Sequence, residues 1–293
     1  MSVTKLSADA VASRAVRGRR RFRITPLRVL IGVLLAALAV VVLYPLLWMA
    51  ISGFKTNAEL FGDAWGLPAQ WRFSNYVQAW DYGVVHYIFN SLVVTVGSIV
   101  LVTLVSSFAA FALVQVRIPL GQPILMLILG GLMLSETVAL VPLFRIMRSL
   151  DLYNTLIGII ILYTAFRIPF TTFLIRAYMI DLPTELRDAA IVDGASLWQM
   201  FWRVTLPLCY PILISAAILQ ALFSWNEFVF ALVFIKDDAL KTMPVGLMAL
   251  QSKLTTNWPV VFAGLTISAI PMVLAFLFGQ RHFVRGITEG LGK

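Results

Sequence analysis

Long apolar blocks separated by short polar segments dominate the pattern of this chain. A membrane-spanning helix needs about 20 mostly apolar residues, and six blocks reach that length. Pro45 and Pro169 lie inside two of them, where we expect each proline to bend its helix. The pattern predicts an all-α fold, a polytopic bundle of six transmembrane helices. The predicted spans lie near 27–51, 88–114, 122–143, 155–178, 209–235 and 260–280.

The composition agrees with a membrane protein. Of 293 residues, 60% are hydrophobic and only 13% are charged, whereas about 25% are charged in a typical soluble domain. The first block is too long for the core of a signal peptide, and no small-x-small cleavage site follows it before Lys55. We therefore expect it to be an uncleaved span.

Basic residues predict the orientation. The segment 1–26 is rich in lysine and arginine and has one acid, Asp9. Because positively charged flanks stay inside, both termini are expected in the cytoplasm, with 115–121 and 179–208 inside and 52–87, 144–154 and 236–259 outside. The basic cluster adjoins the first span, which favours a topology anchor at the lipid bilayer over a nucleic-acid partner. The basic residues of the cluster and its edge are Lys5, Arg14, Arg17, Arg19, Arg20, Arg21, Arg23 and Arg28.

Few side chains suit a metal site or a reaction. The one cysteine, Cys209, excludes an internal disulfide, and the two histidines, His86 and His282, are far apart in the sequence. We predict no metal, no catalytic residue and no enzymatic activity, because acids, bases and metal ligands do not cluster. A secondary transporter would show internal repeats, and none is evident.

Aromatic residues mark the predicted outer loop 52–87. Tryptophan and tyrosine favour the membrane–water interface. The same residues could instead contact an external partner, and both readings stay open. They are Trp65, Trp71, Tyr76, Trp80 and Tyr82.

The inner segment 181–207 predicts a short helix, a glycine turn and a second helix. Asp181 or Thr184 can cap the first helix, and Gly194 suits a helix end with positive φ. Ser196 starts a capping box with the glutamine three residues later. Pro207 then bends or breaks the second helix before the fifth span.

The first of these helices has a docking character. It comprises about nine residues, or roughly 13 Å, which is too short and too charged to span a bilayer. At helical spacing Leu182, Leu186, Ala189 and Ala190 fall on one side. The two alanines would let another surface approach the backbone closely, as expected of a helix offered to a cytoplasmic partner.

The same segment resembles a family signature. Asp188-Ala-Ala-Ile-Val-Asp-Gly194 resembles the E-A-A-x-x-x-G motif of ABC importer permeases, followed at the family's spacing by Leu206-Pro207. Asp188 replaces the usual glutamate, which keeps the charge and shortens the arm. The resemblance implies an ATPase-coupling role for Glu185, Leu186, Asp188, Ala189, Ala190, Asp193, Gly194 and Pro207.

Other segments resemble carbohydrate-type permeases, in particular the smaller permease of maltose-type systems. The resemblance covers most of the chain from about Ser52 onward, and the basic tail is outside it. A permease for a non-sugar solute (peptide, polyamine or phosphate) stays as the alternative. The matching segments are Ser224–Phe228, Val141–Phe144, Met243–Leu247 and Arg281–Gly286.

The resemblance implies a larger machine in the bacterial cytoplasmic membrane. A second, homologous permease, two ATP-binding subunits and an extracytoplasmic sugar-binding protein are the expected partners. The chain has no G-x-x-x-x-G-K-[ST] phosphate loop, so we expect it to bind no cofactor, with ATP-Mg used by the partner subunits. The expected regions are a basic tail 1–26, a first helix and outer loop 27–87, a core 88–285 containing the coupling loop 181–207, and a C-terminal tail 286–293.

Polar residues inside the predicted spans form the last candidate set. A charge facing lipid at a helix centre costs about 2.5–3.5 kcal/mol, so Glu136, Arg167 and Glu227 should face the interior. Two roles are open: an ion pair of Arg167 with one of the two acids, or a polar lining of the translocation path that also includes Asn226. In maltose-type systems the larger permease makes most of the sugar contacts, which disfavours direct binding here.

Overall fold

The structure is a computed structural model that describes residues 26–116, 118–253 and 257–291. Within those ranges the regular elements are all helices, which confirms the all-α prediction. The chain divides into two units, residues 1–47 and Trp48–Lys293. The basic tail predicted to fix the topology, residues 1–25, lies outside the described residues.

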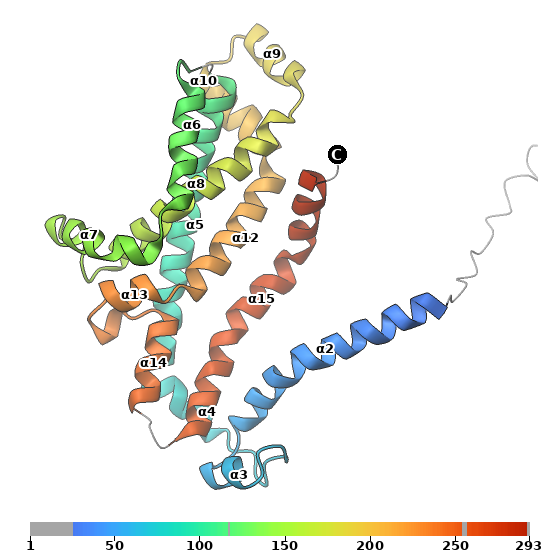
Figure 1. Cartoon of the computed structure of the whole chain (residues 1–293), viewed down its shortest axis with the longest axis vertical. Helices are drawn as coiled ribbons and strands as arrows, with labels where there is room; N and C mark the ends of the chain where they lie inside the picture. The colour runs from blue at the N-terminus through green and yellow to red at the C-terminus, as the bar shows by residue number, and fades with distance from the viewer. Residues whose placement is uncertain (1–25, 117, 254–256, 292–293) are drawn as a thin grey trace, which may run out of the picture. The chain divides into compact units, whose positions relative to one another are not determined.

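Four described helical stretches are long and apolar enough to cross a bilayer, and there are up to six if each of two bent pairs is one span. The higher number equals the six spans predicted from the sequence. The first span belongs to helix α2 (Pro26–Ser52), which contains Pro45 in its interior. In the second unit, α5 (Val85–Gln115), α8 (Leu156–Ile180), α12 (Tyr210–Asn226) and α15 (Trp258–Leu291) form the bundle (Figure 1).

The second span begins earlier than predicted. α4 (Ser74–Ala79) and the π-helical turn η1 (Trp80–Val84) continue into α5, so residues 74–87 are helical rather than part of a loop. Gly83 has φ +110°, a conformation that glycine adopts readily. Glycine therefore permits the kink at which α4 joins the long helix.

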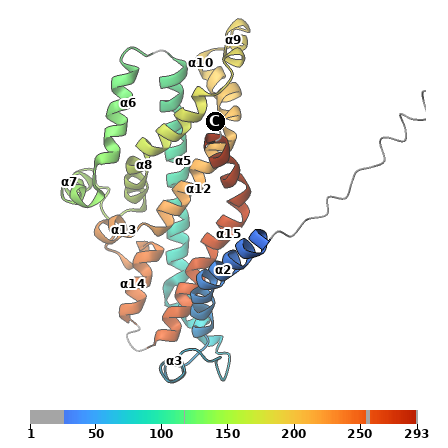
Figure 2. The ribbon, with the colours of Figure 1, turned by 45° about the vertical axis from the view of Figure 1, so that its right-hand side comes forward.

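The third predicted span, 122–143, is broken. α6 (Gly121–Gly130) and the short 3-10 turn η2 (Gly131–Met133) are followed by a 103° bend into α7 (Glu136–Ser149). α7 accordingly lies across the direction of α6 (Figure 2). The polar residues at the bend begin a new helix, with Ser135 extended and Glu136 in the first turn, where an acid interacts favourably with the helix dipole.

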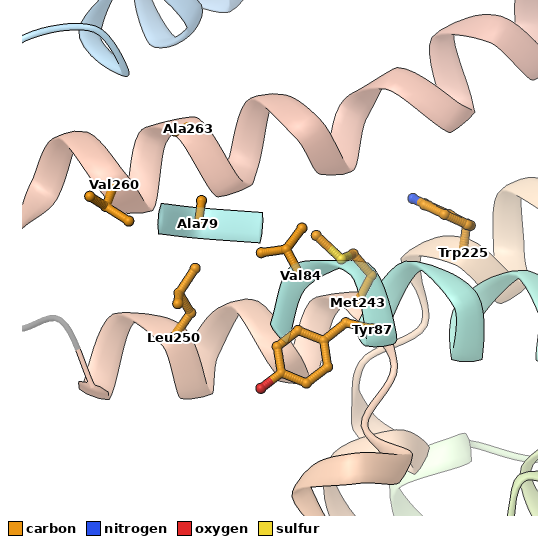
Figure 3. Close-up of a cluster of buried hydrophobic side chains, with 8 residues drawn as sticks. All are labelled: Ala79, Val84, Tyr87, Trp225, Met243, Leu250, Val260 and Ala263. Carbon is orange, nitrogen blue, oxygen red and sulfur yellow. The ribbon is translucent and has the colours of Figure 1, made fainter. Parts of the chain in front are cut away.

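The fifth predicted span, 209–235, is also interrupted. α12 ends at Asn226, Glu227 is extended, and the short α13 (Val229–Phe234) follows. The segment expected as an outer loop then contains the 3-10 turn η4 (Asp238–Leu240) and a packed helix, α14 (Met243–Lys253). Met243 and Leu250 of α14 join a buried cluster with Tyr87 and Trp225 (Figure 3). The hydropathy pattern did not reveal α14 because the helix has only 11 residues, too few to span a bilayer.

Different short helices lie at the two ends of the second unit. α9 (Thr184–Val192) and α10 (Leu197–Gln199) lie at one end, near the connection between α5 and α6, while α3 (Asn57–Gly62) lies at the opposite end (Figures 1 and 2). The predicted inner loops therefore share one end of the bundle.

Hydrogen bonds to the backbone order the loop that carries α3. Lys55, only 1% exposed, donates through Nζ to the carbonyl oxygens of Asp63 and Ala64, both at 3.0 Å. Thr56 forms a capping box with Glu59, and the bond from the Thr56 backbone N–H lowers the pKa of the Glu59 carboxyl. These local bonds order the first outer loop between two spans.

Some aromatic side chains of the predicted outer loop pack within the protein, and others are exposed. The ring of Trp71 lies 5.2 Å from that of Phe54, and Tyr76 donates from its hydroxyl to the Ala50 carbonyl oxygen at 2.7 Å. Trp65, 72% exposed, keeps most of its surface open. Packing within the loop accounts for part of the aromatic pattern, and the exposed rings leave the interfacial or partner-binding role as a prediction.

Candidate coupling segment and intramembrane cavity

α9 has the nine residues predicted for the docking helix. Its start was predicted wrongly, because neither Asp181 nor Thr184 caps it. Asp181 ends α8 as its C-cap, Pro183 occupies the N-cap position without a side-chain bond, and Thr184 is already helical. Proline here fixes φ near −65°, which directs the chain into the helix without a capping side chain.

The glycine turn after α9 is confirmed. Gly194 has φ +75°, and its backbone N–H donates to the Ile191 carbonyl at 3.0 Å, while Ala195 N–H donates to the Ala190 carbonyl at 2.9 Å. This pair of bonds is the Schellman motif, which satisfies carbonyls at a helix end. A left-handed residue is required at its centre, so the sequence choice of glycine has a backbone cause.

The capping box of the second helix is also confirmed. Ser196 Oγ accepts from the Gln199 backbone N–H at 3.3 Å, and Gln199 Oε1 accepts from the Ser196 N–H at 2.9 Å. The helix continues through a π-helical stretch, η3 (Met200–Thr205), into α11 (Leu206–Leu208). A 75° bend then leads into α12. Pro207 lies next to that bend, as predicted.

The face that α9 presents was predicted wrongly in part. Ala190 is only 8% exposed, so it packs against the protein rather than facing a partner. Leu182 precedes the helix and packs against the cluster that includes Met179 and Phe201. The exposed apolar side chains of the helix are instead Leu186 (42%), Ile191 (57%) and Val192 (86%). Sequence spacing had placed Leu182 on a helix that starts two residues later.

Three acidic residues and one alanine of the predicted coupling set are also exposed on this segment. Glu185, Asp188, Ala189 and Asp193 are all exposed. Asp188 pairs with Arg187 at 3.0 Å across the surface. An exposed ion pair of this kind contributes little to stability. Exposed acids therefore alternate with exposed apolar side chains around α9.

Aromatic packing joins this segment to α5, a feature that the sequence analysis missed. The ring of Phe108 stacks on Phe201 with centroids 4.3 Å apart and on Trp198 at 5.7 Å. Phe111 meets Phe201 edge-on at 5.2 Å. The spacing of Trp198, Phe201 and Trp202 on one helix face was the available signal. The second helix of the segment is thus held to the bundle while α9 projects from it.

Of the two roles left open for Arg167, a close ion pair is absent from the described residues, although Glu136 still acts on the guanidinium electrostatically from farther away. Among the described residues no ion pair within 4.0 Å joins Arg167 to Glu136 or Glu227. The guanidinium lies instead over the ring of Phe223, with Cζ 3.5 Å from the ring centroid. A cation over an aromatic face gains about 0.5–2 kcal/mol, which replaces part of the stabilisation that an acid would supply.

The other polar residues of the predicted spans interact with helix ends or with nearby backbone groups. Glu227, 6% exposed, accepts from the backbone N–H groups of Phe230 at 2.7 Å and Ala231 at 3.2 Å. Its charge therefore meets the N-terminus of α13 rather than Arg167. Asn226 donates back to the Leu222 carbonyl at 2.7 Å, and Glu136 begins α7. A path-lining role of these three residues stays a prediction.

Arg167 lines a cavity. A cavity of about 330 Å³ lies between α8 and α12. One wall carries Arg167 and Thr171, and the other carries Gln220 and Phe223. The lining residues are Arg167, Phe170, Thr171, Leu219, Gln220, Leu222 and Phe223.

A buried polar chain reaches this cavity and was not anticipated from the sequence. Gln220 Nε2 donates to Ser224 Oγ at 2.9 Å, and Ser224 Oγ lies 2.7 Å from Ser98 Oγ of α5. All three residues are at most 2% exposed. Serine pairs across packed helices are typical of membrane bundles, where small polar side chains replace the hydrophobic effect as a source of association.

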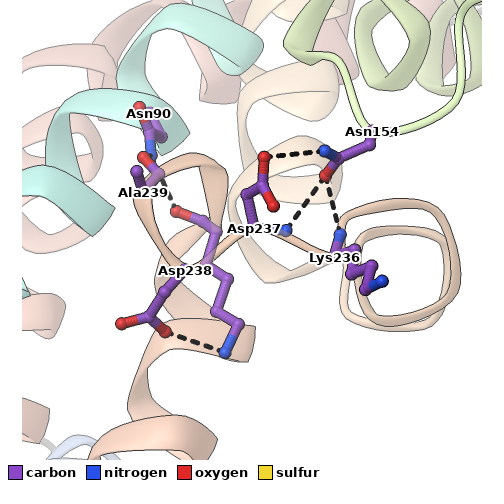
Figure 4. Close-up of polar contacts among 7 residues, drawn as sticks. Asn90, Asn154, Lys236, Asp237, Asp238 and Ala239 are labelled. Atoms are coloured by element: carbon purple, nitrogen blue, oxygen red, sulfur yellow. Dashed lines mark hydrogen bonds and ion pairs between the residues drawn. The ribbon is translucent and has the colours of Figure 1, made fainter.

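A polar latch, made by Asn154, Lys236 and Asp237, connects the loop before α8 to the loop after α13 (Figure 4). Asn154, with φ +58°, accepts through Oδ1 from the backbone N–H groups of Lys236 and Asp237 at 2.8 and 3.0 Å. Its Nδ2 donates to Asp237 Oδ2 at 2.9 Å. Nearby, Asn90 Nδ2 donates to the Ala239 carbonyl at 2.8 Å. The latch fixes the loop after α13 to the start of α8.

The helical bundle, the projecting α9 with its glycine turn and the buried polar cavity together define a membrane-transport protein. The chain belongs to the family of binding-protein-dependent transport system inner membrane components, whose model matches residues 110–289. This confirms the resemblance read from the sequence.

Relatives span nearly the whole chain. The probable ABC transporter permease protein YurM of Bacillus subtilis is 45% identical over 254 residues, 87% of this chain and 85% of the relative. The diacetylchitobiose uptake system permease protein NgcG of Streptomyces coelicolor is 32% identical, over 88% of this chain and 86% of the relative. A crystal structure of a bacterial ABC transporter that imports the acidic polysaccharide alginate contains a chain with a TM-score of 0.77 and 25% identity, over 87% of this chain and 95% of that one.

Proposed function

We propose that this chain is a membrane-spanning permease subunit of an ATP-driven sugar importer, that it forms half of the translocation path, and that it couples to ATPase subunits through residues 181–207. The observation that carries the coupling role is the position of α9. It projects at one end of the bundle (Figure 1), with Leu186 and Val192 exposed beside Glu185 and Asp188. Exposed apolar side chains on a short charged helix suit a cleft in a soluble partner better than a lipid surface.

The relatives support a sugar as the solute. One is named for uptake of diacetylchitobiose, and the structural neighbour belongs to an importer of a polysaccharide. These names do not favour the alternative of a peptide, polyamine or phosphate permease.

The expected assembly follows from this role. The chain would pair with a second homologous permease, bind two ATP-binding subunits at the α9 end and receive sugar from an extracytoplasmic binding protein at the opposite end. ATP-Mg would be used by the partner subunits. This arrangement places the α9 end, and both termini, on the cytoplasmic side of a bacterial inner membrane, which is the side that the basic tail favours.

The test is to replace an exposed leucine of α9 by an acid and purify the whole transporter. Burying a leucine at an interface contributes about 1.5–3 kcal/mol, so Leu186→Glu should reduce co-purifying ATPase subunits by about tenfold or more. The matched control is Leu67→Glu, which changes a leucine 74% exposed in the outer loop, far from α9. Full retention of ATPase subunits and of sugar-stimulated hydrolysis by Leu186→Glu would refute the coupling assignment.

A further inference from the structure

The cavity between α8 and α12 contains polar groups that the folded chain leaves without partners. Gln220 is 2% exposed, and its Nε2 is used by Ser224, but its Oε1 has no hydrogen-bond partner. A buried acceptor without a donor costs about 1–3 kcal/mol. Such a group at the wall of a cavity is expected to meet a donor that enters the cavity.

The opposite wall supplies the complementary group. Arg167 lines the same cavity, and its buried Nε has no hydrogen-bond partner. Its guanidinium is held in place over the Phe223 ring, and no acid lies within 4.0 Å of it among the described residues. An arginine stays charged and offers donors only. The cavity therefore has a fixed cation on one side and an acceptor on the other.

This combination selects a class of solute. A sugar ring carries hydroxyls that both donate and accept, and its apolar face can pack on an aromatic ring such as Phe170 in the lining. The volume of about 330 Å³ is within the range of small-molecule sites, roughly 300–1,000 Å³. The guanidinium favours oxygen acceptors, including carboxylates, and repels cations, although Glu136 offsets part of its charge from outside contact distance.

We propose that this cavity is a sugar-contacting subsite of the translocation path on this chain, in which Arg167 donates to hydroxyl or carboxylate oxygens, Gln220 accepts from a hydroxyl, and cationic solutes are disfavoured. The inference rests on the proposed function as a permease. It gives this subunit a share in selecting the solute, in addition to its coupling role.

The experiment measures which chemical groups enter the cavity. In the complete transporter with Cys209→Ser, Thr171→Cys places a thiol in the lining. Three methanethiosulfonate reagents are compared, which carry a glucosyl, a sulfonate or a trimethylammonium group. The rate at which each reagent modifies the thiol is divided by its rate with a small free thiol in solution, which corrects for intrinsic reactivity. We expect the first two to react about threefold to tenfold faster than the third, because a charge several ångströms from the guanidinium changes a rate by about this factor at intermediate dielectric.

Two variants test the residues. Arg167→Gln should abolish the preference for the sulfonate over the ammonium reagent, and Gln220→Leu should lower the rate of the glucosyl reagent. Folding is checked by size-exclusion chromatography. If Arg167→Gln does not fold, the test of the subsite rests on Gln220→Leu. The control Phe173→Cys, on the same helix but 47% exposed and outside the cavity lining, should show no preference among the three reagents.

The outcomes separate the subsite from the proposed function. No reaction at Thr171→Cys, equal rates for all three reagents, or a preference unchanged in both variants would overturn the subsite. If the same preparation keeps its ATPase subunits and its hydrolysis, the permease role stands while the subsite fails. If the unmodified transporter did not bind ATPase subunits at all, the proposed function itself would be contradicted.

Discussion

The left-handed turn at Gly194 provides a graded test of the coupling segment. At φ +75° an L-residue with a Cβ costs about 1–2 kcal/mol relative to glycine. A Cβ built there meets nothing within 4 Å. The cost of a substitution is therefore conformational and not a clash, so the spans should fold normally while the segment loses its preference for the docked geometry.

The size of the effect depends on the residue introduced. Asparagine visits the left-handed region several times more often than most residues, whereas a β-branched residue is an outlier there. We expect Gly194→Asn to be nearly neutral, Gly194→Ala to cost about 1 kcal/mol and Gly194→Val about 2 kcal/mol. These costs correspond to a fall in affinity for the ATPase subunits of up to about fivefold and thirtyfold, respectively.

The assay is a titration of purified ATPase subunits onto the permease pair in lipid nanodiscs. Gly62→Val is the matched control, because Gly62 lies at the opposite end of the bundle, has no positive φ and also has open space at the Cβ position. The order glycine, asparagine, alanine, valine supports the reasoning. Binding by Gly194→Val as tight as by the unmodified protein, or binding by Gly194→Asn as weak as by Gly194→Val, would refute it.

Three further changes test the fold around the site through the thermal midpoint of the detergent-solubilised protein. Gly158→Ala should destabilise the α7–α8 turn by about 1–3 kcal/mol, because its Cβ would overlap the Leu152 carbonyl oxygen, whereas Gly130→Ala, with nothing within 4 Å, should not; equal midpoints would contradict this. Glu227→Ala should cost about 1–3 kcal/mol by leaving two backbone N–H groups unsatisfied, and an unchanged midpoint would argue against the cap. Asn154→Ala should cost about 1–2 kcal/mol through its lost hydrogen bonds. An unchanged midpoint would show that these bonds do not stabilise the fold.

Features set within a few residues could be predicted from the sequence. The Gly194 turn and the Ser196–Gln199 capping box depend on bonds between groups at most five residues apart. The long spans likewise follow from local hydropathy. Pro207 marks the bend because proline removes a backbone donor wherever it stands. In each case the physical cause is contained in the segment itself.

Features set by distant partners could not be predicted in this way. Arg167 was expected to seek an acid, but its guanidinium rests on Phe223, which is on another helix, and Glu227 is used by the backbone of α13. Ala190 was expected to face outward because spacing cannot tell which side of a short helix meets the bundle. The packed helix α14 was missed because it is too short to span a bilayer and its partners, such as Tyr87, come from elsewhere in the chain.

The connectivity relates the coupling segment to the cavity. α8 carries Arg167 and ends at Ile180, shortly before α9. α12 carries Gln220 and begins directly after the bend at Cys209. The segment 181–207 is therefore the covalent link between the two walls of the cavity. The stacked Phe108 and Phe201 hold its second helix to α5. α9 follows α8 along the chain and packs against η3, which continues through α11 into α12, so a displacement of α9 would act on both walls. An ATPase-driven movement of α9 would then shift the Arg167 wall relative to the Gln220 wall and change how both groups reach a solute.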